Sequence, residues 1–284
     1  MNNRLLRFKF ILLGFPAFIG FTLMYIIPFG RTLRYTVVDD TWWERFVGLK
    51  NFRELLQDEA FHNALKSTVV FSVIGVVCLV TFSLLLAMGL QKLGNRLAFV
   101  KSLLIAPIIM PTAAVVFVWQ MLFSWTTSPS EFRYLVGNVA GGGFWSVLPI
   151  YLLYIWKNTG LNIIILGAAI AGIPAEAREA AILDGAKGFR LFRSVTLPLI
   201  SPVLTFVVML SFSNSLKGFR ESLLFYSPLP PPDALYTIPF YMDEYFQNFV
   251  FSRLTTSSVV FTFLIVLVLL VLYRWENQYN EKIY

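Results

Sequence analysis

The chain alternates between long apolar stretches and shorter polar connections. Six stretches are long enough to cross a bilayer as helices of about 20 residues, namely residues 10–30, 66–90, 98–124, 147–171, 196–216 and 256–273. The pattern therefore predicts an all-α integral membrane protein with about six transmembrane helices. We divide it into residues 1–65, which hold the first helix and a first external loop, and residues 66–284, which hold a five-helix core.

Composition supports this fold class. The chain is 57% hydrophobic and 14% charged, with a mean hydropathy of +0.69, whereas soluble domains carry about 25% charged residues. The single Cys78 excludes an internal disulfide and a cysteine metal site, and the lone His62 excludes a histidine-rich metal cluster. The N-terminus mimics a secretory signal, but its apolar stretch is too long and lacks a clear cleavage site, which predicts a retained helix.

The net charge of +7 is spread in short clusters between the predicted helices. This distribution fits membrane orientation better than nucleic-acid binding. Basic residues dominate the short connections on one side, whereas the longer loops near 31–65, 125–146 and 217–255 mix acids with bases. The positive-inside rule therefore predicts that both termini and residues 172–195 are cytoplasmic.

One polar connection, residues 173–198, is unusually charged. It contains Glu176, Arg178, Glu179, Asp184, Lys187, Arg190 and Arg193. Burying them at a bilayer centre would cost about 2.5–3.5 kcal/mol each, on the order of 20 kcal/mol in total, so the segment lies outside the hydrocarbon. Pro174 ends the preceding helix, residues 175–186 are mostly strong helix formers, and Gly185 and Gly188 predict a bend between two short helices.

This segment has two interpretations. An amphipathic helix lying on the membrane surface would carry large apolar residues and mainly basic charges. Small alanines and mixed charges fit better a helix inserted into a groove of a partner protein.

A motif lies within the same segment. Glu179-Ala180-Ala181 is followed after three residues by Gly185, after nine more by Val195, and then after one by Leu197-Pro198. This spacing between two predicted spans resembles the EAA loop of ABC-importer permeases, with Val195 where the family pattern has isoleucine. The wider run 173–202 resembles the carbohydrate-uptake branch of maltose, glycerol-phosphate and multiple-sugar permeases, and weaker similarity extends from residues 47–52 to 238–242.

The resemblance implies the type I ABC importer permease fold, with residues 172–195 as a cytoplasmic coupling-helix loop that docks on an ATPase subunit. It implies that Glu179 makes a polar contact with the ATPase subunit, and that Asp184 stabilises the turn. The small residues Ala180, Ala181 and Gly185 would allow the helix to dock closely on that subunit. Leu197 and Pro198 complete this set of ATPase-coupling residues.

The resemblance further implies the partners of the chain. They are a second permease subunit in a heterodimer, two ATPase subunits, an extracytoplasmic solute-binding protein and the lipid bilayer of a bacterial cell membrane, without nucleic acid. The chain has no G-x-x-x-x-G-K-[ST] phosphate loop, so we expect it to be no enzyme and to bind no cofactor, with ATP and Mg²⁺ on the ATPase subunits. The solute would be a sugar or a related molecule. The rival interpretation is a self-contained secondary carrier or channel for a small polar solute.

Polar residues within the predicted spans mark a possible solute pathway. We select Gln120, Lys157, Asn158, Asn162 and Asn214 for it. Gly160 could permit local unwinding of the fourth span, as in transporter sites. The alternative is a polar face packed against neighbouring helices, with Lys157 snorkelling outward and Asn214 at the membrane interface. Pro107 and Pro111 predict a kink in the third span, and no span has an acidic residue at its centre.

Overall fold

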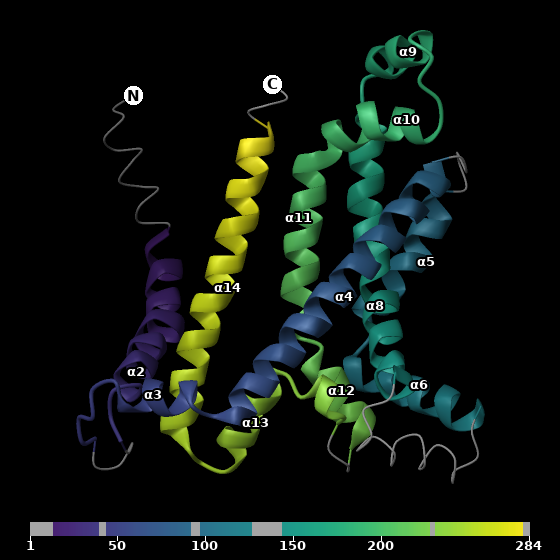
Figure 1. The fold of residues 1–284 in the computed structure, drawn as a ribbon. Helices are drawn as coiled ribbons and strands as arrows, with labels where there is room; N and C mark the ends of the chain where they lie inside the picture. The colour runs from purple at the N-terminus through teal and green to yellow at the C-terminus, as the bar shows by residue number, and fades with distance from the viewer. Residues whose placement is uncertain (1–13, 40–43, 92–96, 127–143, 228–230, 281–284) are drawn as a thin grey trace, which may run out of the picture. The chain divides into compact units, whose positions relative to one another are not determined.

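The protein is helical in a computed structural model that describes residues 14–39, 44–91, 97–126, 144–227 and 231–280 (Figure 1). Within these ranges, extended pairing is limited to an isolated bridge between Val38 and Phe46, which confirms the predicted all-α class. Contacts divide the chain into a first unit, Met1–His62 with Tyr241–Leu264, and a second unit, Asn63–Phe240 with Ile265–Tyr284. The predicted boundary at residue 65 rests on membrane topology rather than on contacts and stays a prediction.

Five helical segments are long and apolar enough to cross a membrane. They are Gly14–Tyr35, Glu59–Leu90, Ser146–Ala171, Phe189–Tyr226 and Phe251–Gln278. A bent pair of helices, Leu103–Ile109 and Thr112–Phe123, brings the number to six if it counts as one span. The prediction of about six spans is confirmed in this sense. Residues 1–13, which include the basic N-terminal cluster, lie outside the described ranges.

The kink predicted in the third span, residues 98–124, is present at Pro111 as a sharp break, and helix continues through Pro107. Helices α5 (Leu97–Ile109) and α6 (Thr112–Thr126) are bent by 109° at a short break. Pro107 lies inside α5 without ending it, so the bend comes at Met110 and Pro111 instead. A proline there disfavours a helical conformation for the residue before it and cannot donate a backbone hydrogen bond.

The first unit contains α2 (Ile27–Tyr35), α3 (Lys50–Leu56) and the adjoining ends of α4 (Glu59–Leu90), α13 (Ile238–Gln247) and α14 (Phe251–Asn280). Asn51 is buried and donates from Nδ2 to the carbonyl oxygens of Thr36 and Val38, at 3.0 and 2.8 Å. This bidentate contact ties α3 to the segment that follows α2, which gives a structural reason for asparagine in the stretch 47–52.

Asp58 joins α3 and α13 within the same unit. Its carboxylate accepts a hydrogen bond from the Tyr241 hydroxyl at 2.8 Å and forms an ion pair with Arg253 at 3.5 Å. Tyr241 is fully buried. Burial, together with the hydrogen bond to Asp58, raises the pKa of Tyr241 above its ordinary value of 10.0.

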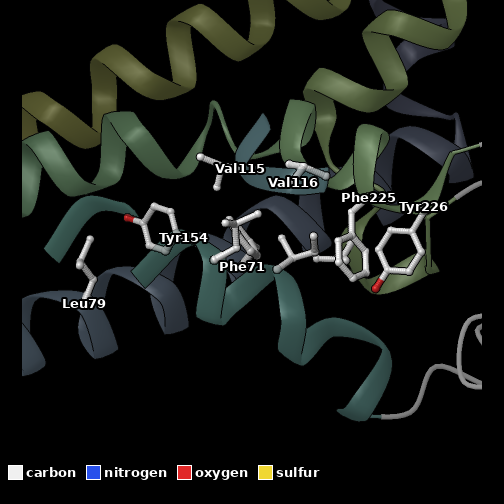
Figure 2. Packing of buried hydrophobic residues seen from close by; sticks show 10 residues of the cluster. Phe71, Leu79, Val115, Val116, Tyr154, Phe225 and Tyr226 are labelled. Atoms are coloured by element: carbon white, nitrogen blue, oxygen red, sulfur yellow. The ribbon is translucent and has the colours of Figure 1, made fainter. Parts of the chain in front are cut away.

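The second unit is built around α4, α8 (Phe144–Ala171) and α11 (Leu197–Ser215). One buried cluster runs from Leu79 past Tyr154 and Phe71 to Phe225 and Tyr226 (Figure 2). Helices α9 (Ala175–Leu183) and α10 (Phe189–Leu191) lie at one end of α8 and α11, whereas α6 and α12 (Phe219–Tyr226) lie at the other (Figure 1). The charged segment is therefore separated from the α6–α12 region by the length of α8.

Gly160 is a packing residue rather than a point of unwinding. Helix α8 continues through it without a break, so the predicted unwinding is wrong. A Cβ at this position would overlap the carbonyl oxygen of Leu104 in α5. The missing side chain therefore lets the backbones of α5 and α8 touch, as small residues do at helix contacts in membranes.

Candidate functional site

The charged segment forms two short helices joined by a tight turn. Helix α9 begins after Pro174 and ends at Leu183, with Asp184 as its C-cap. Gly185 follows with φ +82°, and Gly188 with φ +53° precedes α10. A π-helical turn, η4 (Phe192–Thr196), then leads into α11 with Pro198 in its first turn. The predicted bend between two short helices is present.

The turn after α9 explains why glycine stands at position 185. The amide of Ala186 donates to Ala181 O at 2.9 Å, and the amide of Gly185 donates to Ile182 O at 3.0 Å. These two bonds form a Schellman motif, whose residue after the C-cap adopts a left-handed conformation. A residue with a Cβ would be strained at this φ.

Helix α9 offers its side chains to the exterior of the unit, because none of its residues is buried. Glu179 and Ala180 are exposed, and Ala181 is half-buried. Ile182, Leu183 and Phe189 are large apolar residues that are 45%, 88% and 74% exposed. A charged residue beside such apolar ones, on a segment too polar for the hydrocarbon, is typical of a protein contact surface.

A second site is a cavity of about 270 Å³ between α8 and the α11–α12 segment. It is lined by Ile108, Ile150, Tyr154, Lys157, Asn158, Asn214, Lys217, Gly218 and Glu221. The structure thus brings together three of the five residues selected for the solute pathway, Lys157, Asn158 and Asn214. Their place in a cavity leaves their role in transport a prediction.

Lys157 and Glu221 form an ion pair in the cavity wall. Lys157 Nζ lies 2.7 Å from Glu221 Oε1 and donates to Thr112 Oγ1 at 3.0 Å. The side chains are only 17% and 13% exposed, so the alternative in which Lys157 snorkels outward is wrong. Glu221 Oε2 is buried and has no hydrogen-bond partner. The pair therefore connects α8, the first residue of α6 and α12.

The remaining selected residues make structural contacts. Asn162 is buried and donates to Ser211 Oγ at 2.9 Å. Gln120 donates to the carbonyl oxygens of Leu224 and Phe225 at 3.1 and 2.9 Å, near the end of α12. Neither lines the cavity. For these two, the alternative of polar packing between helices describes the observed contacts.

Comparison of the chain with known proteins identifies its family. The family model described as "binding-protein-dependent transport system inner membrane component" matches residues 79–282, which contain both the α9–α10 segment and the cavity. The chain belongs to this family. It is therefore an inner-membrane permease component.

Similar permeases match along nearly the whole chain. The probable starch degradation products transport system permease AmyD of Thermoanaerobacterium thermosulfurigenes is 26% identical over 94% of this chain and 92% of its own length. The sn-glycerol-3-phosphate permease UgpA of Escherichia coli UTI89 is 28% identical over 93% and 92%. A chain of a bacterial ABC transporter involved in alginate import has the same fold, with a TM-score of 0.78 at 19% identity, covering 98% of this chain and 99% of that one.

Sequence reasoning about this permease missed Glu221, because residues 217–255 were assigned to an external loop. A signal was present nonetheless. Asn214, Lys217, Gly218 and Glu221 follow the i, i+3, i+4, i+7 spacing of one helix face. In the structure, helix persists with a short turn as far as Tyr226, and this face lines the cavity. A lysine inside a span also calls for a counter-ion.

Proposed function

We propose that this permease is the membrane subunit of an ATP-driven importer that translocates a sugar or a related solute. Support comes from the family match, and from relatives whose names specify starch degradation products and glycerol 3-phosphate. An extracytoplasmic binding protein delivers the solute, and a second, different permease subunit completes the membrane part. Both termini and α9 face the cytoplasm in this proposal.

The observation that carries the proposal is the exposed α9–α10 surface. It combines Glu179 with the apolar Ile182, Leu183 and Phe189, next to a turn held by Gly185. An ATPase subunit that binds ATP and Mg²⁺ takes this surface into a groove, and movement of the ATPase pair is transmitted to α8 and α11. The pathway residues Asn158 and Asn214 then contact the solute in the cavity between these helices.

Replacement of Glu179 tests the coupling. In the reconstituted importer, Glu179→Lys removes a polar contact and reverses its charge, and loss of one partner of a buried charge pair costs about 2–5 kcal/mol. Uptake should therefore fall at least about tenfold, since about 1.4 kcal/mol corresponds to a factor of ten. ATP hydrolysis should persist but no longer depend on the loaded binding protein.

The matched control is Glu176→Gln, one helical turn earlier on α9, which should keep uptake near the original level. Radiolabelled maltose and sn-glycerol 3-phosphate serve as the solutes. Normal coupled uptake by Glu179→Lys would contradict the role of α9, and ATP-independent uptake would favour a self-contained carrier.

A further inference from the structure

The Lys157–Glu221 pair leaves hydrogen-bonding capacity at the wall of the cavity. A lysine ammonium has three N–H donors, and two of them are used by Glu221 Oε1 and Thr112 Oγ1. Glu221 Oε2 is a buried acceptor without a partner. The pair thus holds one unused donor and one unused acceptor, on residues that both line the cavity.

The unpartnered oxygen calls for an explanation. Leaving a buried polar group without a hydrogen bond costs about 1–3 kcal/mol, and more for a charged group. The terminal torsion of a glutamate is broad and soft, so a rotation of the carboxylate turns Oε2 toward a donor in the cavity. A hydrogen-bond donor on a solute is therefore a suitable partner for this atom.

The charges of the pair restrict the chemical class of that solute. Lys157 and Glu221 neutralise each other at 2.7 Å, so an anion placed between them would be repelled by the carboxylate, and a cation by the ammonium. A neutral group that both donates and accepts meets no such repulsion. Neighbouring hydroxyl groups of a sugar have this property.

Other features of the cavity agree with a sugar. Its volume of about 270 Å³ is just below the ~300–1,000 Å³ usual for small-molecule sites. Tyr154 contributes an aromatic ring to the lining, and Asn158 and Asn214 contribute amides. Thr112, at the first position of α6, holds Lys157 and so fixes the direction of its remaining N–H.

We propose that Lys157 and Glu221 together bind two adjacent hydroxyl groups of the transported solute and so determine its specificity. Glu221 accepts a hydrogen bond from one hydroxyl, and Lys157 donates to the oxygen of its neighbour. This inference rests on the proposed function, because it assigns the hydroxyl-bearing substrate class of that transport pathway to two particular side chains.

The transport test uses the complete reconstituted importer with maltose and sn-glycerol 3-phosphate as probes. Glu221→Gln keeps an oxygen for Lys157 but replaces the free acceptor by an NH₂ donor. We expect the KM for uptake to rise roughly tenfold, as loss of a hydrogen bond to a charged group implies, with a smaller change in kcat. Glu59→Gln, at an exposed external carboxylate, is the matched control and should change neither constant. An unchanged KM, or a fall in kcat alone, would overturn the proposal.

A second test does not depend on which solute is imported. A water-soluble carbodiimide activates a carboxylate, and an adjacent amine then attacks it and forms an amide with loss of a urea, so Lys157 and Glu221 should become cross-linked. Mass spectrometry of the complete importer should detect this cross-link, and its formation should be slowed by glycerol or maltose but not by the same concentration of propan-1-ol. Absence of the cross-link, or equal slowing by all three compounds, would overturn the diol site. Absence of uptake by the unaltered importer would instead overturn the proposed function.

Discussion

Single residues decide how the contact surface of α9 is presented. Gly185 is the clearest case, because its φ of +82° ends α9 through two backbone hydrogen bonds. Within the described part of the chain, Glu44 and Phe249 are the non-glycine residues with positive φ. The turn at Gly185 needs a residue that adopts positive φ without strain, whereas the neighbouring positions of α9 have helical φ and accept any helix-forming residue.

Gly185→Ala should weaken this turn. The left-handed conformation costs an L-residue about 1–2 kcal/mol, so the α9–α10 pair would be less often in its docking geometry, and coupled uptake should fall several-fold. Gly172→Ala, where a Cβ would make only ordinary contacts at 3.5 Å, should have little effect. The effects of the two substitutions are measured as uptake, and as ATP hydrolysis stimulated by the loaded binding protein, in the reconstituted importer. Equal effects of the two substitutions would argue against a special role for the turn.

Tyr241 makes the first unit sensitive to alkaline pH. Its raised pKa means that the folded chain keeps the hydroxyl proton above pH 10.0, where the unfolded chain loses it. The contribution is therefore complete below pH 10.0 and is lost as pH rises further. Tyr241→Phe should cost about 1.5–3 kcal/mol at neutral pH, because it removes a hydrogen bond to a carboxylate, and should flatten the alkaline decline.

Denaturant unfolding of the purified chain across this pH range measures the effect. Tyr245→Phe is the control, since its hydroxyl lies 3.5 Å from the same Asp58 oxygen and should contribute less. An unchanged alkaline decline in Tyr241→Phe would refute the assignment.

Small residues allow two helices to approach closely, and one such contact determines how α5, α6 and α8 pack together. The contact at Gly160 brings α5 against the middle of α8, and the break after α5 then sends α6 away at 109°. Lys157 is three residues before Gly160 and meets Thr112 just beyond that break. The close contact at Gly160 and the Lys157–Glu221 ion pair therefore both stabilise the junction of α5, α6 and α8.

Gly160→Ala should disturb the junction of α5, α6 and α8. Its Cβ would overlap backbone atoms of Leu104 rather than a movable side chain, so α5 and α8 must separate, at a cost of about 1–3 kcal/mol for overpacking. We expect a lower thermal midpoint in detergent and reduced uptake. Gly89→Ala, on α4, is the matched control because nothing lies within 4 Å of its Cβ. A midpoint as high as that of the control would show that the two helices adapt.

The sequence describes helices better than the ways in which they break. Long apolar stretches predicted α4, α8 and α14 as spans because lipid requires internally bonded backbone. The kink at Pro111 was predicted, but its angle of 109° was not. The close packing at Gly160 was missed, since periodicity carries no information on which helix lies alongside another. Glu221 was missed because residues 217–255 were assigned to an external loop, and its partner Lys157 is 64 residues away.

At the scale of the molecule, the protein is an inner-membrane permease whose α9–α10 segment and cavity lie in one unit. Helix α9 lies beyond one end of α8 and α11, and α12 beyond the other end (Figure 1). If residues 172–195 are cytoplasmic, α12, at the other end of α8 and α11, faces outward. This orientation is predicted from the positive-inside rule, to which basic residues near α9 such as Arg190 and Arg193 contribute.

Labelling from the two sides of the membrane tests this orientation. In a Cys78→Ser background, Leu183→Cys at an 88% exposed position of α9 should react with a membrane-impermeant maleimide only after the cells are opened. Phe249→Cys, 77% exposed between α13 and α14, should react in intact cells. Reaction of Leu183→Cys from outside would overturn both the orientation and the docking role of α9.

The order of residues alone determined that the protein is helical with several apolar spans, and that the charged segment after α8 bends near Gly185. These conclusions follow from local hydropathy, charge and backbone freedom, which a linear pattern contains. Folding in three dimensions decided which polar residues share a cavity. It grouped Lys157, Asn158 and Asn214 with Glu221 and assigned Asn162 and Gln120 to helix packing, because burial and pairing depend on neighbours far apart in the chain.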